Sequence, residues 1–293
     1  MSISTGILFG LIALFGWGLA DFFAKRVIDK TGDFKALFWM QLLSMIPFFA
    51  LYLAVDGRFL FPLKDYLMFI LTSILGIIGY FMFYKAIRLG NISIISPIQA
   101  SYVVLTVILA VIFLGERLIA EQTISIAIVF IGLVMTGINF TALKSLRKVE
   151  LLAGVKEDLI SAGCFGFHFV FIGIMVAKYG WLVPVFFFRV FNVIFLLLYT
   201  YFFSREFKIK LSAMDNYIYR LFPLIVIFDV AAILGFSLGV NSEYVSIVTP
   251  VALSFPLVTV TLASIFYKER LDKIQIIGII LLISGIILLS YFS

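Results

Sequence analysis

Residues 93–118 read SIISPIQASYVVLTVILAVIFLGERL, and residues 246–271 read SIVTPVALSFPLVTVTLASIFYKERL. The two stretches align without a gap at a constant offset of 153. The alignment extends to residues 137 and 290, with 17 identities in 45 positions. A repeat of this length indicates two homologous halves, and both halves are almost wholly apolar. Internal repeats inside a helical membrane protein are typical of transporters.

The composition of the chain predicts that its solvent is a lipid bilayer. Of its 293 residues, 63% are hydrophobic and only 13% are charged, and the mean hydropathy is +1.19. A soluble protein of this length needs more polar surface to cover its core. The net charge of +6 sits in loops between apolar segments, so we do not expect a nucleic-acid partner. A single cysteine and no nucleotide-binding motif argue against a metal site or a cofactor.

Ten segments are long and apolar enough to cross a membrane, which takes about 20 residues each. They are residues 3–24, 36–55, 66–88, 93–114, 122–142, 158–178, 181–203, 218–240, 244–267 and 272–292. The first is too long for a signal-peptide core, so we expect a retained span. The predicted fold is an all-α integral membrane protein of two five-helix repeats. The first repeat covers 1–143, a cytoplasmic linker covers 144–157, and the second repeat covers 158–293.

The distribution of basic residues predicts the orientation. Five spans per half is an odd number, so the second half enters from the opposite side and the repeat is inverted. Of the 22 Lys and Arg residues, 17 fall on the side reached after the first span, 4 fall on the other side, and Arg189 lies within a span. Because basic loops stay in the cytoplasm, we expect both termini outside the cell membrane. The sequence leaves both a monomer and a homodimer open.

The chain resembles the EamA family of the drug/metabolite transporter superfamily. The likeness rests on Phe15-Gly16-Trp17 in the first span, echoed by Phe165-Gly166-Phe167 in the sixth. Further matches are a proline near the start of spans four and nine, a Glu-Arg-Leu closing each of them, and an arginine early in span seven; these are Pro97, Pro250, Glu116 to Leu118, Glu269 to Leu271 and Arg189. The second repeat departs at Lys268, where the first has Gly115. The resemblance implies two inverted five-helix units and a transporter of metabolites such as amino acids.

Three ionisable side chains fall at similar depth in consecutive spans. At about 1.5 Å per residue, His168, Arg189 and Asp229 lie roughly 12–16 Å from the outer ends of spans six, seven and eight. Charged residues at this depth are costly and point inward. They predict a substrate-binding or proton-coupling cluster, with protons as the candidate coupling ion. A structural Arg189–Asp229 ion pair, and a histidine satisfied by a neighbouring carbonyl, are the alternatives.

Other residues complete the predicted binding site. Gln99 and Tyr102 follow Pro97 one turn into span four, and Trp17 and Tyr84 are the aromatic residues that we favour as pocket walls. Pro97 and Pro250 each remove a backbone donor near a helix start, which predicts a hinge. They could equally sit in a first turn, where no donor is missed.

Further residues have structural interpretations. Ser125 and Gly132, like Gly278 and Gly285, are seven residues apart, which predicts close packing of spans five and ten. We expect Glu116-Arg117 and Glu269-Arg270 to be interfacial anchors. Asp21 and Lys85 fall at the same ends of spans one and three, where they could pair.

The leading hypothesis is a secondary transporter, an exporter or exchanger for a small polar or amphipathic metabolite. It would work by alternating access, driven by an ion or substrate gradient. Two alternatives come from other classes. The first is an intramembrane enzyme in which Cys164 and His168, four residues apart on one helix face, are nucleophile and base. The second is a membrane scaffold without transport activity.

Overall fold

A computed structural model of the chain describes residues 4–90, 92–138, 153–203, 216–266 and 271–293, and all regular secondary structure within these ranges is helical. The first half contains α1 (Thr5–Thr31), α2 (Asp33–Val55), α3 (Leu63–Leu89), α4 (Ile92–Leu114) and α5 (Ala120–Gly137). The second half contains α8 (Val155–Tyr179), α9 (Leu182–Phe203), α10 (Asn216–Ser242), α11 (Val245–Ala252), α12 (Pro256–Phe266) and α13 (Lys273–Phe292).

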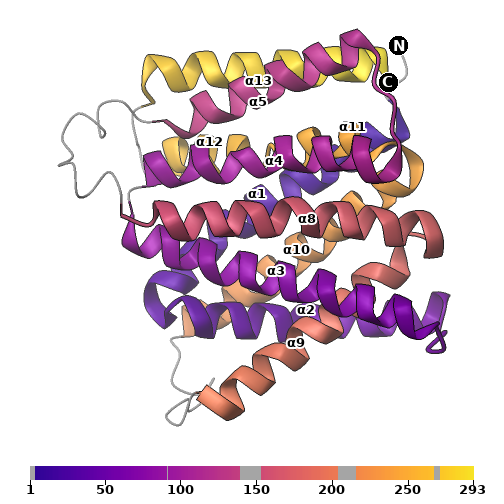
Figure 1. Ribbon diagram of the computed structural model, residues 1–293. Coiled ribbons are helices and arrows are strands. Elements are labelled where there is room, and N and C mark those ends of the chain that lie inside the picture. Colours follow the sequence, from indigo (N-terminus) through magenta and orange to yellow (C-terminus); the bar gives the residue numbers. More distant parts are fainter. Residues whose placement is uncertain (1–3, 91, 139–152, 204–215, 267–270) are drawn as a thin grey trace.

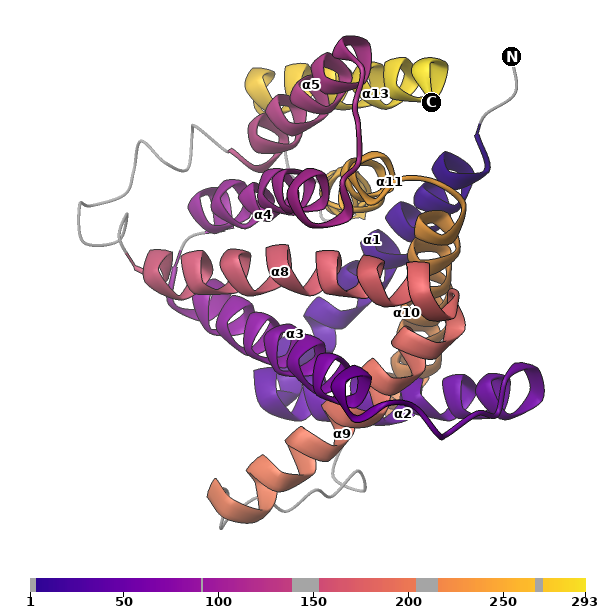
Figure 2. The ribbon, with the colours of Figure 1, turned by 45° about the vertical axis from the view of Figure 1, so that its right-hand side comes forward.

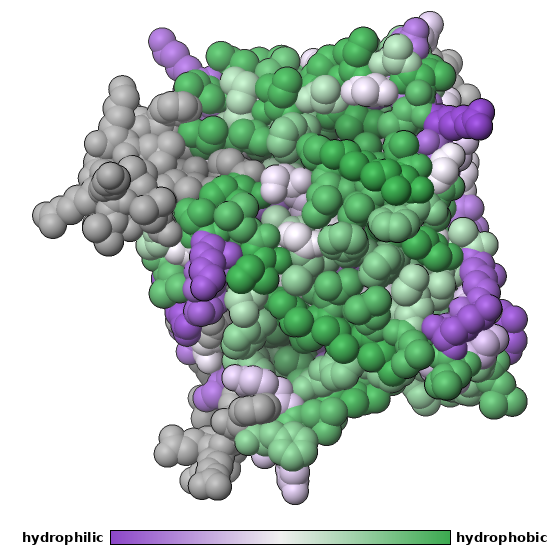
Figure 3. Space-filling view, in the orientation of Figure 1, coloured by the Kyte–Doolittle hydropathy of each residue, from purple (hydrophilic) through white to green (hydrophobic). Residues whose placement is uncertain are grey.

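The helices have the length and composition of membrane spans. Within the described residues, 9 helical segments are long and apolar enough to cross a bilayer, and α11 with α12 counts as one of them. The tenth predicted span is α4, whose apolar stretch is Ile98–Leu114. Large apolar side chains such as Ile112, Ile227 and Ile287 are exposed on the outside. Figure 3 shows this apolar surface between two polar ends. The predicted all-α membrane fold is confirmed.

Both ends of the chain lie at one end of the bundle, which we call the termini face. Figures 1 and 2 show α1 beginning and α13 ending there. The start of α3 and the end of α8 lie there too (Figure 1). Asp65 in the first turn of α3 pairs with Lys178 at the end of α8 at 2.6 Å. The end where α1 and α3 finish and α8 begins is called the opposite face. Each half therefore crosses an odd number of times, as an inverted repeat requires.

The first helix of each repeat packs against helices of the other repeat. Helix α1 lies along α10 and contacts α11 and α12, and the corresponding helix α8 lies along α3 and α4. Glycines permit this close approach. A Cβ on Gly16 would lie 2.7 Å from the carbonyl oxygen of Phe228, and one on Gly166 would lie 2.5 Å from Leu105. The glycines of the Phe-Gly-Trp and Phe-Gly-Phe motifs therefore place α1 and α8 in the centre.

Helices α5 and α13 form an antiparallel pair at one edge of the bundle (Figure 1). A Cβ on Gly132 would lie 2.4 Å from the backbone nitrogen of Leu282. The side-chain amide of Gln122 donates to the carbonyl of Phe292 at 3.0 Å, and that of Gln275 donates to the carbonyl of Thr136 at 3.2 Å. Each glutamine, at the start of one helix, thus holds the end of the other. The predicted packing of spans five and ten is confirmed.

The ninth span is interrupted, whereas its counterpart α4 is continuous. Helix α11 ends at Ala252, and α12 begins at Pro256. Pro256 has no N–H to donate to the carbonyl of Ala252, and the N–H of Leu257 donates to the carbonyl of Ser254. Pro256 has no counterpart in the first repeat, which has Val103 at that position. Pro250 lies inside α11, so the interruption comes after it.

Glu116 is buried, which corrects its interpretation as an interfacial anchor. It is only 8% exposed, and it follows the left-handed Gly115 (φ +68°) that ends α4. Its carboxylate accepts the backbone N–H groups of Val245 at 2.7 Å and Ser246 at 2.9 Å, together with the Ser246 hydroxyl. Glu116 is thus the N-terminal cap of α11 in the other repeat. The equivalent Glu269-Arg270 lies outside the described residues.

Candidate functional site

A buried ion pair lies at mid-depth in the bundle. Arg189 of α9 donates to a carboxylate oxygen of Asp229 on α10 and to the side-chain oxygen of Gln41 on α2. The Ser44 hydroxyl on α2 donates to the same Asp229 oxygen at 2.9 Å. Asp229 is the central residue of α10, and Ser44 is the central residue of α2. These four residues form the midplane cluster, and the expected Arg189–Asp229 pair is present.

Unsatisfied hydrogen-bonding atoms lie on α9 next to this pair. Asn192 lies three residues after Arg189, on the same face of α9, and is fully buried. Within the described part of the chain, neither its amide oxygen nor its amide nitrogen has a partner, and the Nε of Arg189 also lacks one. Leaving such a group unpaired costs about 1–3 kcal/mol. These atoms are therefore available to bind a ligand.

His168 is held by the backbone of a neighbouring helix. Its Nδ1 lies 2.8 Å from the carbonyl oxygen of Thr72 on α3. Its ring centroid lies 4.6 Å from that of Phe188, and the guanidinium carbon of Arg189 lies 5.9 Å from the same Phe188 ring. The phenyl ring thus contacts both residues. The geometry matches the packing alternative for His168, and no hydrogen bond among the described residues joins it to the midplane cluster.

A second carboxylate lies beside the midplane cluster. Asp21 on α1 is half-buried and close enough to Asp229 to interact with it electrostatically. Tyr80 and Tyr84 of α3, both half-buried, interact with the same two acids. Lys85, a possible partner of Asp21, instead pairs with Glu157 of α8 at 3.1 Å. Asp21 therefore adds a second carboxyl group to the site rather than forming the pair with Lys85.

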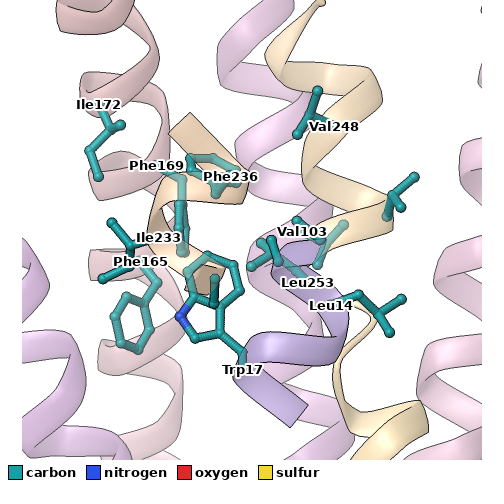
Figure 4. Close-up of a cluster of buried hydrophobic side chains, with 14 of the residues drawn as sticks. Leu14, Trp17, Val103, Phe165, Phe169, Ile172, Ile233, Phe236, Val248 and Leu253 are labelled. Atoms are coloured by element: carbon teal, nitrogen blue, oxygen red, sulfur yellow. The ribbon is translucent and has the colours of Figure 1, made fainter. Parts of the chain in front are cut away.

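Aromatic side chains fill the space between α1, α8, α10 and the broken span (Figure 4). The ring of Trp17 lies 5.9 Å from those of Phe169 and Phe236 and 6.3 Å from that of Phe255. Its buried Nε1 has no hydrogen-bond partner in the described residues. Tyr102 stacks on Phe169 at a ring distance of 5.8 Å. This aromatic cluster offers an apolar wall with one free donor.

The remaining predicted residues lie on the discontinuous span and its counterpart. Gln99 on α4 is buried, and its side-chain oxygen has no partner among the described residues. Pro97 lies within α4, and the structure describes only its backbone. Pro250 is buried within α11. The hinge role of both prolines stays a prediction.

Apart from Gln99, the predicted binding residues form one connected set. Trp17 and Tyr102 meet at Phe169, whose ring lies 5.2 Å from that of His168. The chain of contacts continues from His168 through Phe188 to Arg189 and Asp229. Tyr84 joins through Tyr80, at a ring distance of 6.2 Å. Sequence reasoning missed Asn192, Gln41, Ser44 and Asp21 as members. The three-residue spacing from Arg189 to Asn192 was the available signal for the first of these.

The geometry gives no support to a catalytic Cys164–His168 pair. Cys164 is a free, half-buried thiol. Among the described residues it makes no hydrogen bond with His168, whose Nδ1 is engaged by Thr72. A nucleophile and its base need such a hydrogen bond, with a third group orienting the base.

Apolar spans arranged as two inverted halves, with polar residues buried at mid-depth, define the architecture of a secondary transporter. Comparison with known families agrees with this class. The chain belongs to the EamA-like transporter family, whose model matches residues 4–138 and 152–291, and it is therefore a membrane transporter of the drug/metabolite transporter type. The two matches correspond to the two repeats.

Two individual proteins are similar to the chain. "Uncharacterized protein MJ1333.1" of Methanocaldococcus jannaschii is 28% identical over 137 residues, which are 47% of this chain and 99% of the relative. That relative therefore has about the length of one repeat. A solved protein crystal structure superposes with a TM-score of 0.80 over 100% of both chains at 15% identity. At that identity the likeness shows the fold alone.

Proposed function

We propose that the chain is a secondary transporter that moves a small polar or amphipathic metabolite, such as an amino acid, by alternating access. It acts as an exporter or exchanger in the cell membrane, driven by an ion or substrate gradient. The termini face is outside, because most of the Lys and Arg residues that the structure describes lie toward the opposite face. The two repeats, 1–143 and 158–293, rock around the midplane cluster.

One observation carries this proposal: the midplane cluster holds a buried ion pair flanked by unsatisfied hydrogen-bonding atoms. Arg189 and the Asn192 amide supply donors for a carboxylate, and Asp229 and Asp21 supply acceptors for an ammonium group. The aromatic cluster around Trp17 supplies an apolar wall for a side chain. Ligand sites combine such walls with a few placed polar groups, and this set suits an amino acid.

Asn192 gives the sharpest test, because it makes no hydrogen bond within the described structure. We propose to measure uptake of a pooled mixture of radiolabelled amino acids into liposomes containing wild type or Asn192→Leu. The matched control on the same helix is Thr200→Ala, which removes a hydroxyl bonded to the α9 carbonyl of Leu196. Asn192→Leu should fold and lose uptake, whereas Thr200→Ala should retain it.

Two results would count against the proposal. If the wild type takes up none of the pooled amino acids above empty liposomes, the proposed substrate class is wrong. If Asn192→Leu and Thr200→Ala transport equally well, the midplane cluster is not the binding site.

A further inference from the structure

Asp158 is a fully buried carboxyl group that the proposed substrate site does not use. It lies in the first turn of α8, at the opposite face, and its exposed fraction is 0%. Neither of its carboxyl oxygens has a hydrogen-bond partner in the described residues. The backbone N–H of Gln99 on α4 faces the carboxyl. An ionised carboxylate in such surroundings is strongly destabilising.

The packing around Asp158 is closed. A Cβ on Gly154, just before α8, would lie 2.6 Å from the carbonyl oxygen of Ala86 near the end of α3. One turn beyond Asp158, the Ser161 hydroxyl donates to the carbonyl of Gly79 on α3 at 2.8 Å. Contacts with α3 thus lie on both sides of Asp158 along α8. In this arrangement water does not reach the carboxyl.

Charged groups on the surrounding helices are engaged elsewhere or exposed. On α3, Lys85 pairs with Glu157, and Arg88 is exposed. On α8 itself, Lys156 is exposed. On α9 and α10, Arg189 pairs with Asp229.

Lys64, Asp65 and Tyr66 lie at the start of α3, at the termini face, and the remaining titratable groups of α3 and α4 are the tyrosines Tyr80, Tyr84 and Tyr102. No cation among the described residues therefore forms an ion pair with Asp158. The start of α8 favours an anion through its helix dipole, but that effect is smaller than the loss of hydration.

We propose that Asp158 is a proton-binding site and that its proton controls closure of the opposite face. The closed packing of α8 against α3 and α4 accepts only the neutral carboxylic acid. When these helices separate during alternating access, water reaches the carboxyl and the proton leaves. Closure of the opposite face then requires proton uptake, because a conformation and the ligand that stabilises it are thermodynamically linked. This inference rests on the proposed function and adds a dependence of transport on the pH at the opposite face.

Infrared spectroscopy of the purified full chain tests proton binding without a substrate. At neutral pH, wild type should show the carbonyl stretch of a buried protonated carboxyl group, and Asp158→Asn should lose that band. Glu157→Gln is the matched control, one residue away, and should keep it. A band that is identical in wild type and Asp158→Asn, or that vanishes on adding sodium ions at constant pH, would overturn the proposal.

Flux measurements test this control with the pooled amino acids as probe. Exchange by wild type and Glu157→Gln should slow as the pH on both sides of the liposome is raised, by up to about tenfold per pH unit, because closure of the opposite face needs the proton. Exchange by Asp158→Asn, whose side chain is neutral at every pH, should not slow. A pH dependence of Asp158→Asn equal to that of wild type would refute the role of Asp158. Absence of any wild-type flux would count against the proposed substrate class, while the infrared band would still decide proton binding.

Discussion

Replacing Glu116 by alanine should destabilise the junction between the two repeats. Its carboxylate accepts three hydrogen bonds at the start of α11, from two backbone N–H groups and the Ser246 hydroxyl. The residue before α11, Tyr244, provides no side-chain cap of its own. Alanine therefore leaves the two backbone donors without a partner, at a helix end that is already buried.

The magnitude follows from those three bonds. A hydrogen bond to a charged group contributes about 1.5–3 kcal/mol, so Glu116→Ala should lower the free energy of unfolding by about 5 kcal/mol. Ser246→Ala removes only the hydroxyl bond and should cost about 1.5 kcal/mol. In a double-mutant cycle, Glu116 and Ser246 should show a coupling energy of about 1–2 kcal/mol.

The assay is unfolding of the purified protein by titration of dodecyl sulfate into mixed micelles, followed by circular dichroism. Glu121→Ala is the matched control, because Glu121 is an exposed acid in the first turn of α5. Loss of its favourable interaction with the helix dipole should cost less than about 1 kcal/mol. Equal unfolding midpoints for Glu116→Ala and Glu121→Ala, or a coupling energy of zero with Ser246, would refute the capping role.

Three further predictions use other features. Pro256→Val restores the N–H that the carbonyl of Ala252 lacks, so hydrogen exchange should slow across the junction of α11 and α12; unchanged exchange would contradict this. Gly278→Leu places a side chain 2.6 Å from a backbone nitrogen of α5, and should cost about 3 kcal/mol in the same detergent titration. Arg58 lowers the pKa of the Asp56 carboxyl through a hydrogen bond. That stabilisation is therefore present above the ordinary aspartate pKa of about 3.9 and is lost as the pH falls through the lowered value. Asp56→Asn should flatten the acid limb of a stability–pH profile.

Much of the fold was predictable because the hydropathy of a segment and the charges of its flanking loops can be read from the sequence without knowing which segments are in contact. The predicted span 181–203 and the observed α9, Leu182–Phe203, differ by one residue. The Arg189–Asp229 pair followed from depth alone, since both residues lie within apolar spans.

Other features depend on contacts between distant segments, and local patterns do not reveal these. From the sequence, Glu116 is a charged residue at the end of a span and is expected to be exposed. Only the structure shows that it binds the start of α11, 129 residues further along the chain. Asp158 lies at the edge of the predicted linker, where a solvated acid is the natural expectation, yet it is fully buried. The interruption at Pro256 needs the structure, because a proline in an apolar span is compatible with an unbroken helix, as Pro250 inside α11 shows.

The reciprocal contacts of Gln122 and Gln275 have the form of an isologous interface, in which the same patch serves both partners. Such a surface is self-complementary, so one five-helix unit could associate with a second copy inserted upside down. Covalent fusion of the two units keeps their local concentration high. It also frees each copy to diverge, and the proline at 256, present in only one of them, is such a divergence.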